Sequence, residues 1–190
     1  MKRILPLACL LVSIGAASPQ TQNSAMKAQT PAAGGPTKDP VATSLRLVLQ
    51  RFQNNTIGAM EAMPADKFSY KPTADQITFG HLAAHIANSN NFYCSKIADV
   101  PAPKVDEPKD TDPKDQLVAA VKASFSFCSD ALSKMDDSKL GDTVELFPGR
   151  QLPRSVAVLG LASSLADHYG TAAMYLRLNN ILPPSAQPKK

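Results

Sequence analysis

Apolar positions recur at three- and four-residue steps in four segments of the chain, which is the spacing of one face of an amphipathic helix. We predict helices over residues 41–62, 78–98, 113–135 and 154–180. The alternation typical of strands is not prominent in any of the connections. The pattern therefore predicts an all-α protein, in which the four segments pack as a four-helix bundle.

Helix start and stop signals support these boundaries. Pro64 follows the first segment, and Pro183-Pro184 follows the last. Thr78 is a candidate N-cap, and Asp112 with Pro113 is suited to begin the third helix. The connection over 99–112 is rich in proline and charge, and the segment 142–150 is expected to form a short extended turn.

The first 18 residues have the pattern of a secretory signal peptide. Lys2 and Arg3 precede an apolar run from Ile4 to Ile14, and small residues at 15–17 offer a cleavage site. The run is shorter than the roughly 20 residues that span a bilayer. We expect an exported protein, periplasmic or secreted, that has no membrane segment after the signal is removed.

The segments that flank the predicted bundle are polar and lack apolar periodicity. Residues 19–40 are rich in Pro, Gln, Thr, Ala and Gly, which predicts a flexible linker, and the chain from Pro183 to Lys190 has the same character. The bundle is expected over 41–185, with 186–190 as a tail.

Composition narrows the classes of partner. The 190 residues carry 20 Lys+Arg and 16 Asp+Glu, for a net charge of +4. The positive charges are mixed with acids and form no stripe of the kind that follows phosphates, so nucleic acid is not an expected partner.

Removal of the signal takes Cys9 with it and leaves Cys94 and Cys128. An even number of cysteines in an oxidising compartment favours a disulfide. Two buried free thiols are the alternative.

All three histidines occur in places that suit a metal site. His81 and His85 are four residues apart and share one face of the second predicted helix. His168 falls on the apolar face of the fourth. A buried histidine with one hydrogen bond and a polar surface pair are the simpler interpretations. Nevertheless, all three imidazoles can face one pocket between these helices, and imidazole is a common metal ligand.

Two stretches resemble the DinB/YfiT-like family, and more narrowly its exported members that carry a signal peptide and a cysteine in helix two. The first stretch is Ala62-Met63-Pro64 with Phe68 to Thr73 and then Thr78 to Ser89. The second is His168-Tyr169-Gly170 with Tyr175 to Leu178 and Pro183-Pro184-Ser185. The resemblance covers about residues 41–185. It implies a four-helix bundle in an up-down-down-up arrangement and a divalent metal, often nickel or zinc, held by three histidines.

The resemblance places two of the three ligands on histidines of this chain. One ligand maps onto His85 and another onto His168, but the third maps onto Ser164, whose neutral hydroxyl is a poor ligand for such an ion. Three outcomes are open. His81 replaces the missing ligand; or His85 and His168 bind metal weakly with water or Asp167; or the site is degenerate and the domain is structural or binding.

The resemblance implies metal-dependent hydrolases and transferases that use a low-molecular-weight thiol. We expect a hydrolase rather than a transferase, because an exported protein lacks the cytoplasmic thiol pool. Tyr169 and Ser164 are candidate pocket residues, and the substrate is an unidentified small molecule. The alternative is a non-catalytic exported bundle that serves as a binding or envelope-stress module. Family members can be homodimers, and nothing in the sequence decides this.

Overall fold

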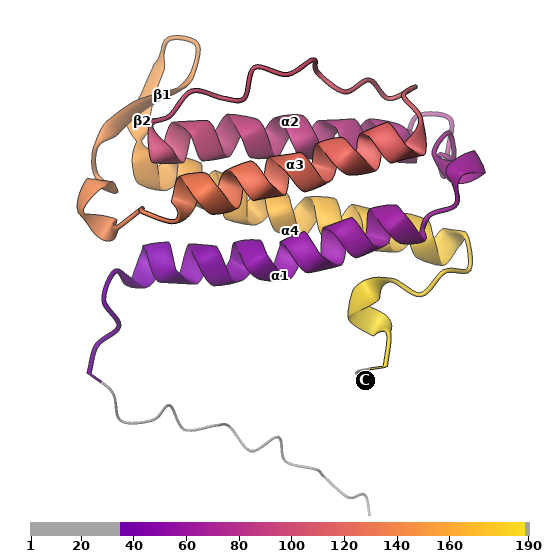
Figure 1. Cartoon of the computed structure of the whole chain (residues 1–190), viewed down its shortest axis with the longest axis horizontal. Coiled ribbons are helices and arrows are strands. Elements are labelled where there is room, and N and C mark those ends of the chain that lie inside the picture. Colours follow the sequence, from indigo (N-terminus) through magenta and orange to yellow (C-terminus); the bar gives the residue numbers. More distant parts are fainter. Residues whose placement is uncertain (1–34, 189–190) are drawn as a thin grey trace, which may run out of the picture. The chain divides into compact units, whose positions relative to one another are not determined.

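The computed structural model describes residues 35–188. The predicted signal peptide and most of the predicted linker lie outside these residues. Four long helices form the bundle: α1 (Pro40–Ala62), α2 (Phe79–Ala98), α3 (Lys114–Leu132) and α4 (Arg154–Leu178) (Figure 1). They correspond to the four predicted segments, so the predicted fold class is confirmed.

Each helix packs against two others around one core. α1 contacts α3 and α4, and α2 also contacts α3 and α4. The interior holds large side chains that are almost fully buried, among them Met60, Phe79, Phe125, Leu161 and Tyr175. Buried apolar residues recur at helical spacing along each helix, and their removal from water is the main force that holds the bundle together.

The start of α1 is capped by a residue that is distant in sequence. The carboxylate of Asp137 accepts hydrogen bonds from the backbone N–H groups of Val41 and Ala42, at 3.0 and 2.8 Å. Asp137 belongs to the short 3-10 helix η2 (Asp137–Lys139). A negative group at this position satisfies N–H groups that have no partner within the helix and interacts favourably with the helix dipole.

A β-hairpin stands where only a short extended turn was expected. β1 (Thr143–Phe147) pairs antiparallel with β2 (Arg150–Pro153). The turn passes through Gly149, whose φ of +72° suits glycine, and the Glu145 side chain accepts a hydrogen bond from the Gly149 N–H. Leu146 is buried against the bundle and anchors the hairpin. Only one of the nine strand residues is buried, so the alternation of apolar and polar residues is too weak to be recognised in the sequence.

The third helix begins differently from the prediction. Pro113, not Asp112, is at the N-cap position, and the Asp112 carboxylate accepts a hydrogen bond from the Lys109 N–H within the preceding loop. This helix ends at Leu132 rather than at 135. The other three helices begin and end within two residues of their predicted bounds.

The chain from Pro183 onward was predicted to be flexible, but part of it packs on the bundle. Pro183 is buried, and the 3-10 helix η3 (Pro184–Ala186) contacts α1. The Tyr169 hydroxyl holds this segment through Ser185. The composition of the segment gives no sign of the hydrogen bonds between Tyr169 and Ser185 that hold it in place.

The predicted disulfide between Cys94 and Cys128 is present and joins α2 to α3, with the two Cα atoms 5.2 Å apart. Both cysteines are fully buried. Within residues 35–188, no helix is long and apolar enough to cross a membrane.

The loop between α2 and α3, residues 99–113, runs back along α2, and we call it the strap (Figure 1). Gly80 lets the strap approach closely, because a Cβ there would collide with the backbone oxygen of Asp110. The Gly80 N–H in turn donates to the Phe68 carbonyl at 2.8 Å. A residue with no side chain therefore fixes the path of the strap near the start of α2.

Candidate histidine site between α2 and α4

The three histidines lie in one row across α2 and α4. The ring centroids of His81 and His85 are 6.5 Å apart, with the rings nearly parallel. The rings of His85 and His168 are 4.9 Å apart and meet edge to face. The structure therefore brings all three predicted residues together, with His85 in the middle.

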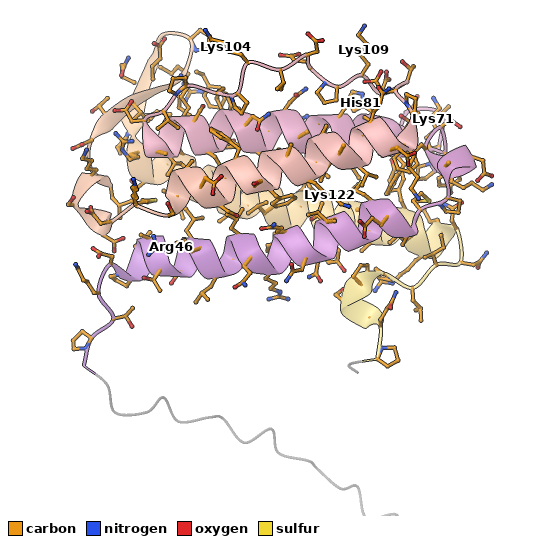
Figure 2. All side chains as sticks on the ribbon, in the orientation of Figure 1. Arg46, Lys71, His81, Lys104, Lys109 and Lys122 are labelled. Atoms are coloured by element: carbon orange, nitrogen blue, oxygen red, sulfur yellow. A yellow bond between two sulfur atoms is a disulfide. The ribbon has the colours of Figure 1, made fainter. Side chains whose placement is uncertain are left out.

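The environments of the three rings differ greatly. His81 and His85 lie on the exposed flank of α2, whereas His168 is 8% exposed. The Thr78 hydroxyl caps α2 by accepting from the His81 N–H at 3.0 Å, as predicted, which fixes the helix turn that carries His81. The His81 ring lies between α2 and the strap, with its Nδ1 3.9 Å from the Asp110 carboxylate (Figure 2).

Hydroxyl groups occupy the position where the resemblance implies a third imidazole. The Ser164 Oγ lies 3.4 Å from the Nδ1 of His168 and 3.1 Å from the Oγ of Ser89. Ser164 precedes His168 by one turn of α4, and Ser89 follows His85 by one turn of α2. A short chain of hydrogen bonds therefore links the two helices beside the histidines.

Burial keeps His168 neutral. Loss of contact with water, reinforced by electrostatic repulsion from His85, lowers the pKa of His168 to about 4, while Asp167 opposes the shift. At neutral pH the ring therefore has one nitrogen with a free lone pair, the form that binds a metal or accepts a hydrogen bond.

Tyr169, a candidate pocket residue, is engaged elsewhere. Its hydroxyl donates to the Ser185 Oγ at 2.6 Å and accepts from the Ser185 N–H at 2.9 Å. This geometry anchors the C-terminal segment and leaves little capacity to hold a substrate. Asp167 is exposed, and Arg177 donates to the Ala173 carbonyl near the end of α4.

The residues present do not fit a complete three-ligand metal centre. Among residues 35–188, no group of three or more His, Cys, Asp or Glu side chains is placed to hold a metal ion. Two imidazoles and a neutral hydroxyl are a weak donor set, and His81 faces Asp110 on the strap. Metal binding at His81, His85 and His168 stays a prediction that the geometry does not strengthen.

Two residues of this site were not identified from the sequence. Ser89 lies four residues after His85, so the spacing that identified the histidine pair could also have identified Ser89. Asp110 lies on the strap and contacts His81 only because the loop folds back along α2, for which the sequence gives no signal.

The structure defines a four-helix bundle in which two histidines and a serine form a polar site between α2 and α4. Comparison with known proteins places the chain in a family. A sequence model of the DinB superfamily matches residues 48–172, so the chain belongs to the DinB superfamily. No curated protein matches it significantly.

Two solved structures share the fold. A DinB-like protein from Bacillus cereus ATCC 10987 is 18% identical, with a TM-score of 0.62, and the match covers 75% of this chain and 95% of that one. The DinB-like protein YjoA from Bacillus subtilis is also 18% identical, with a TM-score of 0.61, and the match covers 77% of this chain and 99% of that one. At this identity the likeness concerns the fold alone.

Proposed function

We propose that this protein is an exported, non-catalytic bundle of the DinB superfamily that acts by binding a partner. The observation that carries the proposal is the Ser164 hydroxyl, which lies within hydrogen-bond distance of Ser89 and His168 at the place of a metal ligand. A serine at this position links α2 to α4 through hydrogen bonds and offers only a weak donor to a metal.

Two candidate helper side chains near the histidines are not placed to assist a reaction, which supports the same proposal. The Tyr169 hydroxyl is held by Ser185, and Asp167 is exposed to solvent. Burial lowers the pKa of His168 to about 4, which makes this imidazole a weak base near neutral pH.

Two features support export. The first 18 residues have the pattern of a secretory signal. The disulfide between Cys94 and Cys128 is typical of proteins that fold in an oxidising compartment.

A metal-dependent hydrolase is the second candidate function, and the proximity of two imidazoles favours it. The rings of His85 and His168 are 4.9 Å apart, and His168 is neutral. A metal there would have to complete its coordination with water or a weak ligand, because Ser164 supplies only a hydroxyl.

Elemental analysis of the protein purified from the periplasm tests the two candidates. We compare the wild-type chain with Ser164→His, which restores the family's donor set, and with His168→Ala. We expect no stoichiometric metal in the wild type or in His168→Ala, and about one divalent ion per chain in Ser164→His. About one ion in the wild type that His168→Ala abolishes would overturn the proposal and favour the hydrolase.

A further inference from the structure

A second concave site lies away from the histidines, at the other end of α2. This cleft has a volume of about 1090 Å³. Its lining comes from the C-terminal half of α2, the strap, β1 and the first residue of α4. This volume is slightly above the range for small-ligand pockets, about 300–1,000 Å³, so the cleft has room for a ligand larger than a typical small molecule.

Two walls of the cleft are extended backbone. Consecutive residues of β1, from Thr143 to Phe147, line it, as do Val100 to Pro103 of the strap. Because side chains of a strand alternate between two faces, consecutive lining residues indicate that an edge of the strand borders the cleft. Among residues 35–188, β1 is paired with β2 alone, so its other edge has backbone groups without a strand partner there.

The strap also leaves its backbone groups free. Between residues 101 and 108 no backbone-to-backbone hydrogen bond forms, and three of these residues are prolines, which lack an N–H. Lys109 extends from the strap to the side facing away from α2 (Figure 2). The charged side chain thus avoids the space between strap and helix.

The floor of the cleft has one unpaired acceptor and one unpaired donor. Asn91 Oδ1 and Arg154 Nε are buried, and neither has a hydrogen-bond partner. The Arg154 side chain is 8% exposed, and its Nη1 donates to the carbonyls of Ile97 and Lys96. The Arg154 guanidinium is therefore held by carbonyls at the C-terminal end of α2, and neither unpaired atom is exposed to a ligand in the cleft.

The remaining lining favours a partly apolar ligand without a large net charge. The rings of Phe92 and Phe147 are stacked 5.7 Å apart, and Phe147 is 40% exposed. The charges around the cleft are of both signs, with Lys96 and Arg154 opposed by Asp99, Glu107 and Glu145. This mixture does not favour a phosphate or another anion.

We propose that this cleft binds an extended polypeptide segment of another protein, which adds to the free edge of β1 and places an apolar side chain against Phe147. Each peptide unit supplies one N–H donor and one carbonyl acceptor, the two groups that the free edge of a strand requires. The proposal deepens the binding role proposed above and rests on it, but it involves none of the residues of the histidine site.

The test uses the full chain labelled with ¹⁵N and a capped pentapeptide, Lys-Val-Thr-Val-Glu, as the probe. We expect saturable shifts of backbone amide signals confined to the strap and β1, at peptide concentrations up to about 1 mM. The matched probe has the same side chains but N-methyl groups on alternate amides. It should bind at least about tenfold more weakly, because it cannot pair with a strand edge.

Two variants locate the contact. Phe147→Ser should weaken binding of the pentapeptide by about tenfold, a loss of about 1.4 kcal/mol. The control is Leu47→Ser, because Leu47 on α1 is 63% exposed and no residue of α1 lines the cleft. This control should leave the affinity unchanged.

Several results would overturn the proposal. They are the absence of shifts at the strap and β1, equal binding of the N-methylated probe, and equal binding by Phe147→Ser. If the β1 amide signals shift with protein concentration alone, a second copy of this chain, rather than another protein, pairs with the free edge of β1. If the same signals shift when residues 1–34 are deleted, the occupant of that edge is a segment of this chain. If the pentapeptide does not bind and the wild type contains no metal, the cleft proposal fails but the non-catalytic assignment stands. Metal in the wild type would overturn that assignment, whatever the result of the peptide titration.

Discussion

Single carboxylates can determine the stability of a helix end, and Asp137 is the clearest case in this protein. It accepts hydrogen bonds from the N–H groups of Val41 and Ala42 at the start of α1. We expect Asp137→Ala to lower the free energy of unfolding by about 1 kcal/mol, because those two groups lose their partner. Urea unfolding followed by circular dichroism measures the change.

The control for this prediction is Asp130→Ala, because Asp130 is an exposed aspartate of α3. It should change the free energy of unfolding by less than about 0.5 kcal/mol. Equal stabilities of Asp137→Ala and the wild type would show that the cap contributes nothing in solution.

His168 should make stability depend on pH. Burial lowers its pKa to about 4, below the value of 6.5 expected when the chain is unfolded. Between these two values the unfolded chain binds the proton and the folded chain does not. The free energy of unfolding should therefore fall by about 2–3 kcal/mol as the pH drops from about 6.5 to about 4, with no contribution from this group above that window.

Urea unfolding at a series of pH values between 7 and 4 measures this slope. His168→Gln should remove most of it, whereas His81→Gln should retain it, because His81 is half exposed. An unchanged slope in His168→Gln would assign the pH dependence to other groups.

At the scale of elements, the distance between α2 and α4 is set in part by Gly160 of α4. A Cβ at Gly160 would lie 2.6 Å from the Tyr93 ring of α2, whereas a Cβ at Gly170 would meet nothing within 4 Å. We expect Gly160→Ala to lower the free energy of unfolding by about 1–3 kcal/mol through overpacking. Gly170→Ala should raise it by about 0.5–1 kcal/mol through helix propensity.

Thermal and urea unfolding of both variants measure these changes. The two substitutions are chemically identical and lie in the same helix, so each is a control for the other. Stabilisation by both would mean that α2 and α4 have room to separate at Tyr93.

The helices could be predicted because their signals are local. Apolar residues such as Leu45 and Leu49 recur at helical spacing, and Thr78 marks a helix start within its own four residues. The hairpin could not be predicted from the sequence, because a single buried residue, Leu146, fixes it to the bundle.

The histidine site shows the same division between local and distant determinants. The sequence identified His81, His85 and His168 from spacing and helix faces, and their rings do meet in one row. It could not show that Asp110 reaches His81 or that Tyr169 holds Ser185, because both contacts depend on how loops fold over helices. The cleft bordered by β1 depends on the unpredicted hairpin and was missed for the same reason.

At the scale of the whole molecule, the disulfide between Cys94 and Cys128 is the covalent link between α2 and α3. We expect reduction to lower the free energy of unfolding by about 2–4 kcal/mol, because the unfolded chain regains the freedom of the closed loop. Urea unfolding with and without reductant measures the effect.

A variant with Cys94→Ala and Cys128→Ala should have the same free energy of unfolding with and without the reductant. Thiol counting on denatured protein from the periplasm should find no free thiol if the signal has been removed with Cys9. Two titratable thiols in that protein would contradict both the bridge and the oxidising compartment it implies.

The cap of α1 also has a consequence for the order in which the chain is made. Asp137 follows Val41 by 96 residues, so α1 leaves the ribosome long before the side chain that completes it. Its buried face depends on α3 and α4, which also follow α1 in the chain. The first half of the nascent chain therefore has little native structure to adopt. This suits the export proposed above, because such a chain can pass through a narrow translocation channel without first being unfolded.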